Sequence, residues 1–213
     1  MRPGRAGAVA GAGALTVGGA AIAYMRLLRE RCNNWGATEE EIERRMPGDE
    51  LVPEPDMLAN RAIAIEAPPS AIWPWLVQMG SGRGGAYTYD WIENLFGLDM
   101  HSADEILPEH QDLALGDVVP LGPNGPGMRV ERLEPERAMS WRHEDGNWVW
   151  TFGLYPEGGA TRLVSRNRIA LPGDSAARRL FTTLFMEPGS LVMERKMLLG
   201  IKERAERGTG ARK

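Results

Sequence analysis

The chain has 213 residues with 29 acidic and 25 basic side chains, so its formal net charge at pH 7 is -4. This length suits one well-cored domain with an appendage, and without a basic stripe to neutralise phosphates we expect no nucleic-acid partner. The single cysteine, Cys32, excludes an intrachain disulfide, and the spacing of the three histidines gives no reason to expect a metal or another cofactor.

The first element is the uncharged run AGAVAGAGALTVGGAAIAYM at residues 6–25, which has arginines on both sides. A helix of about twenty apolar residues spans a bilayer. We therefore expect an uncleaved, single-pass transmembrane helix within residues 1–31. The denser arginine cluster after the run favours a cytoplasmic domain at the cell membrane. Two alternatives stay open: a signal peptide cleaved after residues 21–23, and an Ala/Gly tail.

Residues 32–59 are expected to link this segment to the folded domain. Thr38 followed by Glu41 forms a capping-box pattern, which predicts a short helix over residues 39–45. Prolines follow in the sequence MPGDELVPEPD. Proline and the residue before it both disfavour helix, so an extended connector is expected here.

The domain is expected to begin at residue 60 with a strand, because the sequence NRAIAIEA alternates apolar residues with polar or small ones. Ser70 is a suitable N-cap for the helix that follows, with Pro74 near its first turn. That helix is expected to end near residue 79, where Gly80 provides a C-terminal stop.

Gly80, Gly82 and Gly85 spell the pattern G-x-G-x-x-G. A dinucleotide-binding fingerprint needs these glycines between a strand and a helix. Here they follow one predicted helix and precede another, over residues 88–97. We interpret them as a sharply turning joint and not as a phosphate cradle. A further capping pattern, Ser102 with Glu105, lies downstream.

From residue 117 the sequence is typical of short strands separated by tight turns. The candidate strands are DVVPL, GMRVERLEP, AMSWRH, NWVWTFGLYP and ATRLVSRNRIAL. The turns between the later strands contain EDG and PEGGA. This order predicts an antiparallel sheet and not βαβ units.

The remaining residues are expected to form one helix over residues 176–185 and a longer one that begins near Pro188. The longer helix carries an apolar stripe at helical spacing. The stripe consists of Leu191, Met193, Met197, Leu198, Ile201 and Ala205.

This order of elements resembles the helix-grip fold of the START-like (SRPBCC) superfamily, which includes polyketide cyclases and lipid-transfer domains. The resemblance covers residues 60–207, before a tail at residues 208–213. It rests on IEAPPSAIWPWLVQMG, GAYTYDWIENLFGLDMHSAD and EPGSLVMERKMLLGIKERAE, which look like a bacterial branch with an N-terminal membrane segment. The resemblance implies an α+β fold in which a curved antiparallel sheet wraps around the long C-terminal helix. It also implies a deep apolar cavity between them, without fixing the ligand.

The candidate ligand contacts are aromatic and methionine side chains. In NWVWTFGLY, three aromatic residues share one face of a strand by period two. They line a cavity, or they form core against the C-terminal helix; both interpretations stay open. The full candidate set is Trp141, Trp148, Trp150, Phe152, Tyr87, Tyr89, Met193 and Met197.

Arg162, Arg166 and Arg168 fall together on one face of the last strand, opposite Ser165 and its neighbours. We expect this row on a solvated outer face, because an unpaired buried guanidinium is costly. In the opposite register the row would bind a carboxylate or phosphate headgroup.

Three functions follow as hypotheses. The first is binding, transfer or sequestration of a hydrophobic small molecule or lipid at the membrane, with residues 6–25 as the tether. The second is a cyclase- or dehydratase-like enzyme acting on a bulky apolar substrate. It would need an inward acid–base pair, for which His101 with Asp90 or Glu93 is the candidate. The third is an interaction subunit whose core is filled by its own aromatic side chains.

Overall fold

The structure, a computed structural model, describes residues 27–123 and 125–210. The expected transmembrane run at residues 6–25 lies outside these ranges. Within them, none of the helices has both the length and the apolar character needed to cross a membrane.

Six antiparallel strands form one sheet in the order β1-β6-β5-β4-β3-β2. The strands are β1 (Met57–Ile65), β2 (Val118–Pro120), β3 (Gly127–Glu134), β4 (Ala138–His143), β5 (Trp148–Glu157) and β6 (Ala160–Ile169). The strands predicted beyond residue 117 are all present. Gly146 and Gly158, with φ of 77° and 67°, make the tight turns before and after β5. β1 begins somewhat earlier than its alternating pattern indicates.

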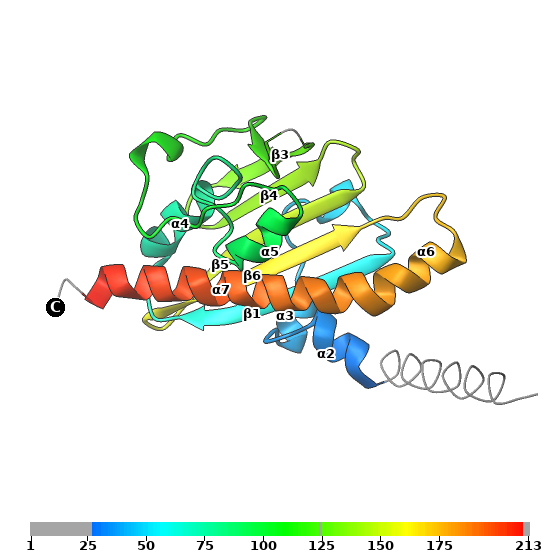
Figure 1. Cartoon of the computed structure of the whole chain (residues 1–213). Helices are drawn as coiled ribbons and strands as arrows, with labels where there is room; N and C mark the ends of the chain where they lie inside the picture. Colours follow the sequence, from blue (N-terminus) through cyan, green and yellow to red (C-terminus); the bar gives the residue numbers. More distant parts are fainter. Residues whose placement is uncertain (1–26, 124, 211–213) are drawn as a thin grey trace, which may run out of the picture.

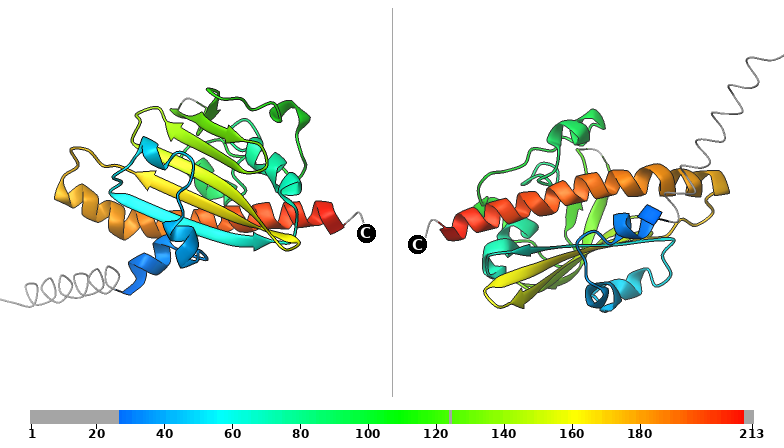
Figure 2. Two further views of the ribbon diagram at one scale, coloured as in Figure 1. Left: turned by 180° about the vertical axis from the view of Figure 1, so that it is seen from behind. Right: turned by 90° about the horizontal axis from the view of Figure 1, so that it is seen from below.

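A long C-terminal helix, α7, crosses one face of this sheet (Figures 1 and 2). The α+β architecture expected from the sequence is therefore confirmed. The helices are α2 (Arg29–Asn33), α3 (Glu39–Glu43), α4 (Pro69–Val77), α5 (Asp90–Leu95), α6 (Ala176–Phe181) and α7 (Glu187–Gly210). Short helical turns are η2 (Asp49–Leu51), η3 (Pro108–His110) and the π-helical η4 (Thr182–Met186).

Several predicted helix ends were wrong. α4 begins at Pro69 and its N-cap is Pro68, not Ser70, because the fixed φ of proline suits the first turn. α5 begins only at Asp90, since its N-cap Tyr89 has φ -96° and ψ 86°, outside the helical region. The two predicted C-terminal helices are joined by η4 into one continuous helical path.

The capping pattern at Ser102 and Glu105 was also a wrong prediction, because no helix begins there. The Ser102 hydroxyl instead donates to Asp90 at 2.6 Å and accepts from the Tyr87 backbone N–H at 3.0 Å. The capping box of Thr38 and Glu41 is confirmed at the start of α3.

The glycine-rich segment turns sharply, as predicted. Gly80 and Gly85 exchange two backbone hydrogen bonds of 3.0 and 3.1 Å. Both have positive φ, as does Gly82 between them. The segment connects α4 to the residues before α5, so no strand directly precedes it.

The core lies between the sheet and the helices α4 and α7. Ile72 and Leu76 of α4 are fully buried against it, as are Leu198 and Ile201 of α7. The apolar stripe of α7 therefore faces the sheet. This packing leaves the other face of the sheet to be covered by the segment before β1.

That segment, residues 36–56, covers the outer face of the sheet and changes the role of the arginine row (Figure 2). Arg166 is 2% exposed, donates to the carbonyls of Glu41, Ile42 and Arg44, and pairs with Asp49 at 2.8 Å. The row faces outward as expected, but the expectation of a solvated face was wrong, because Arg162 and Arg168 are also mostly covered and donate to this segment. Backbone carbonyls and carboxylates of the covering segment take the place of water.

Candidate functional site

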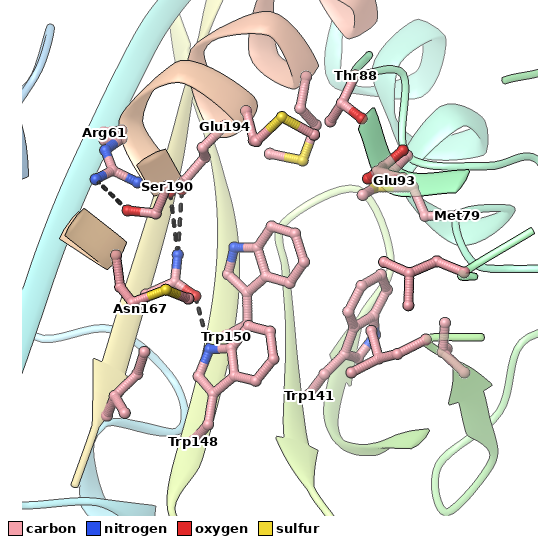
Figure 3. Close-up of a pocket in the computed structure, with 18 of the residues that line it drawn as sticks. Arg61, Met79, Thr88, Glu93, Trp141, Trp148, Trp150, Asn167, Ser190 and Glu194 are labelled. Carbon is pink, nitrogen blue, oxygen red and sulfur yellow. Dashed lines mark hydrogen bonds and ion pairs between the residues drawn. The ribbon is translucent and has the colours of Figure 1, made fainter. Parts of the chain in front are cut away.

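A cavity of about 570 Å³ lies between the sheet and α7 (Figure 3). Cavities of roughly 300–1,000 Å³ are typical of small-molecule sites. The lining comes from α5, η4, α7 and five of the strands, together with the glycine joint. Methionine, leucine and tryptophan side chains dominate it, so the cavity suits an apolar guest.

Tryptophan side chains form one wall of this cavity. Trp148 and Trp150 stack with ring centroids 5.9 Å apart, and Trp141 meets Trp150 edge-on at 5.8 Å. All three line the cavity, whereas Phe152, on the same face of β5, is fully buried and lies outside the lining. The strand face that the sequence singled out therefore divides between cavity wall and core.

The other candidate contacts also separate into two groups. Met193 and Met197 line the cavity from α7. Tyr87 lies outside the lining, is 1% exposed, and donates to the carbonyl of Trp75 at 2.9 Å. Tyr89 is at the surface, where its ring lies near the ammonium of Lys196.

The largest polar feature of the cavity wall is an ion pair between Arg61 of β1 and Glu194 of α7 (Figure 3). Burial raises the pKa of Glu194, against the opposing effect of Arg61. Glu194 also accepts from Ser165 at 2.5 Å and from Asn167 at 3.2 and 3.3 Å. Arg61 donates further to Ser190 at 2.9 Å. We call these five residues the closed cluster.

The tryptophan wall is tied to the closed cluster. The indole N–H of Trp148 donates to Asn167 at 2.7 Å, and that of Trp150 donates to Ser165 at 2.8 Å. The closed cluster therefore joins β1, β5, β6 and α7. Because its members bind one another, its hydrogen-bonding capacity is directed into the protein.

A second set of polar side chains, from α5, the residue Thr88 before it and β4, lies on the other side of the cavity from the closed cluster (Figure 3). Among the described residues, no partner binds Oε2 of Glu93, Oγ1 of Thr88 or Nε1 of Trp141, although all three atoms are buried. Burial raises the pKa of Glu93, an effect that the Asp90 carboxylate adds to and the neighbouring Thr88 hydroxyl opposes. We call Glu93, Thr88 and Trp141 the open group.

The structure does not bring the predicted acid–base residues together. The side chain of His101 is 78% exposed and contacts Asp99 at 3.0 Å. Asp90 accepts from the backbone N–H and the hydroxyl of Ser102. Only Glu93 of the three candidates lines the cavity. Within residues 27–123 and 125–210, no cluster of three or more His, Cys, Asp or Glu side chains is arranged to hold a metal.

Sequence reasoning missed the closed cluster, although two signals for it were present. Glu194 interrupts the apolar stripe of α7, three residues after Leu191 and three before Met197. Ser165 and Asn167 alternate with the outward arginines of β6 and must therefore face inward. A polar residue at a core-facing position indicates a buried partner.

No family model matches the chain, and no curated protein matches it. Solved structures to which it is similar include the KanY protein (ms6282), at 14% identity and a TM-score of 0.47 over 70% of this chain and 97% of that chain. Another is the polyketide cyclase-like protein Cgl2372 from Corynebacterium glutamicum, at 16% identity and a TM-score of 0.39 over 72% and 94%. A third is the Aha1 dimer from Colwellia psychrerythraea, at 18% identity and a TM-score of 0.37 over 71% and 98%. Similarity at this level concerns the fold and says nothing of a ligand or an activity.

Proposed function

We propose that this chain binds a hydrophobic small molecule or lipid in the cavity between the sheet and α7. The observation that carries the proposal is the cavity itself, of about 570 Å³ and lined mainly by methionine, leucine and tryptophan. An apolar cavity without a guest forgoes the dispersion contacts of its lining atoms. A guest of matching shape restores those contacts and displaces little hydrogen-bonded water.

The enzyme hypothesis receives less support, because His101 does not reach the cavity with Asp90 or Glu93. The hypothesis of an interaction subunit with a filled core also receives less, because the tryptophan wall leaves the cavity open. Binding of an apolar guest without a reaction needs only an apolar cavity, and the lining supplies one.

Native mass spectrometry of the full chain tests this function. We expect an adduct that disappears on denaturation and whose identity is read from an organic extract. Met193→Trp places a bulky ring in the cavity wall and is expected to lower occupancy. Val192→Trp is the matched control, because Val192 is 53% exposed on the same helix. A clean apo mass, with no thermal shift on adding fatty acids or isoprenoids, would refute the proposal.

We further propose that binding takes place at a membrane. Exposed apolar side chains run along α6 and η4, and one of them, Met186, also lines the cavity. Arg29 donates two hydrogen bonds of 2.8 Å to Glu187, which holds α2 beside this surface. The uncharged run at residues 6–25 ends shortly before α2 in the sequence. The exposed set is Leu180, Phe181, Phe185 and Met186.

A polarity-sensitive dye on one introduced cysteine, in a chain whose own Cys32 is replaced by serine, tests the membrane part of the proposal. In the full chain held in lipid nanodiscs, a dye at Phe185→Cys is expected to shift to the blue. A dye at Leu115→Cys is the control, because Leu115 is exposed at a site far from η4 in the sequence, before β2. Equal emission from the two positions would contradict contact of η4 with lipid.

A further inference from the structure

The open group has buried hydrogen-bonding capacity that no described residue uses. Glu93 is 9% exposed and Trp141 is 1% exposed. With Thr88, whose hydroxyl lies beside the Glu93 carboxyl, they present three polar atoms without a close hydrogen bond at a cavity wall that is otherwise largely apolar. Buried polar atoms without partners are rare in folded proteins, because each forgoes the hydrogen bonds that it would make to water. Something that occupies the cavity is therefore expected to bind them.

The charges around the cavity narrow the chemistry of that guest. Arg61 is the only cationic side chain among the described residues that line it, and Glu194 already pairs with Arg61. Glu93 and Asp90 are both acidic. A guest carboxylate or phosphate at the open group would meet acidic groups without a cation to compensate it, which is unfavourable in an apolar site.

The hydrogen-bond donors in the open group restrict the chemistry of the guest further. The indole N–H of Trp141 can only donate, whereas the Thr88 hydroxyl can donate or accept. Burial favours the neutral form of the Glu93 carboxyl, which also donates. An ammonium group has no lone pair, so it would leave the indole N–H of Trp141 without an acceptor. A hydroxyl or carbonyl oxygen supplies one.

We infer that the guest is an uncharged, bulky apolar molecule that carries a hydroxyl or carbonyl oxygen, and that this oxygen binds to a donor of the open group. This inference rests on the proposed function, because it needs a guest in the cavity. The apolar body of the guest would lie along Trp148, Trp150 and the methionines of α7. The closed cluster has no capacity left to compete for the polar end.

Binding of four pyrene compounds to the full chain tests the inference, because the four share one apolar body and differ in the polar group. They are pyrene, 1-hydroxypyrene, 1-pyrenecarboxylate and 1-pyrenemethylammonium. Energy transfer from the tryptophan wall to pyrene reports binding. We expect 1-hydroxypyrene to bind about tenfold more tightly than pyrene, as one good hydrogen bond gives, and more tightly than either charged compound.

Substitutions in the open group test whether its residues cause the tighter binding of 1-hydroxypyrene. Glu93→Leu is expected to remove most of the advantage of 1-hydroxypyrene over pyrene, and pyrene binding by the same variant shows that it folds. Glu203→Leu is the matched control, because Glu203 is exposed on α7. Trp141→Phe is expected to weaken the same preference.

The outcomes separate the two proposals. If pyrene and 1-hydroxypyrene bind equally, the inference is overturned and the proposed function stands. Tightest binding of the carboxylate or the ammonium compound also overturns the inference, in favour of an ionic site. If none of the four compounds binds, the proposed function fails together with the inference.

Discussion

The cavity wall carries polar side chains in two places, and their hydrogen bonds are arranged differently. In the closed cluster, Glu194 accepts from Arg61, Ser165 and Asn167. In the open group, Glu93 and Trp141 each keep a buried atom without a partner among the described residues. Both places are apolar, so an unpaired polar atom costs free energy in either. The closed cluster therefore stabilises the fold, whereas the open group has capacity left for a guest.

The difference follows from where the two groups sit in the fold. The closed cluster joins strands β1 and β6 to α7, which are elements that pack directly against one another (Figure 1). The open group comes from the short helix α5, the residue Thr88 before it, and β4 across the cavity. The residues of the open group line a space that no described side chain fills, so a guest in the cavity can reach them.

The largest expected effect comes from breaking the closed cluster. Arg61→Ala leaves Glu194 buried without its cation, and we expect the free energy of unfolding to fall by about 3–5 kcal/mol. Urea denaturation of the full chain in one detergent measures it. The double variant Arg61→Met/Glu194→Met is the control and is expected to recover most of the loss, because no buried charge remains. A single-variant loss below about 1 kcal/mol would be inconsistent with a stabilising cluster.

The same substitution made in both places gives the sharpest test of the comparison. Glu194→Gln removes charged hydrogen bonds and is expected to cost about 1.5–3 kcal/mol. Glu93→Gln replaces a carboxyl whose Oε2 has no hydrogen-bond partner among the described residues, so the stability is expected to change by less than about 1 kcal/mol, or to rise. The same urea titrations compare the two. Equal losses of unfolding free energy in the two variants would contradict the distinction between a paired closed cluster and an unpaired open group.

The smallest expected effect is a pH dependence specific to Glu93. Burial raises its pKa above the ordinary value of 4.5, so the folded chain holds this proton more tightly than the unfolded chain does. The stability that the group contributes is then fully present below the unfolded pKa and is lost as the pH rises through the folded pKa. The stability of the wild type relative to Glu93→Gln is expected to fall as the pH rises above 4.5. Urea titrations over that range measure it, and a constant difference would contradict it.

Local patterns predicted much of the fold. Period-two alternation and the turn glycines located the strands beyond residue 117, and the stripe with Leu198 and Ile201 located the buried face of α7. The capping box at Thr38 was correct, but the similar pattern at Ser102 was not, because Asp90 and the Tyr87 backbone use its hydroxyl. A capping pattern shows what a side chain can bind, and the fold selects among its partners.

The candidate site was predictable only in part. The face carrying Trp148 and Trp150 was identified, and both residues line the cavity. Tyr87 and Phe152 are aromatic like the residues of the cavity wall, but they are buried in the core. Residue type alone does not separate cavity wall from core, because both are apolar.

The sequence by itself determined the order of the elements and the faces that they bury, since these follow from repeats over a few neighbouring residues. Only the tertiary structure decided which polar side chains are paired. Arg61 and Glu194 are 133 positions apart, and Arg166 is bound by a segment more than a hundred positions before it. Partners this distant meet only when strands and helix pack. The same packing leaves Glu93 facing the cavity without a partner among the described residues.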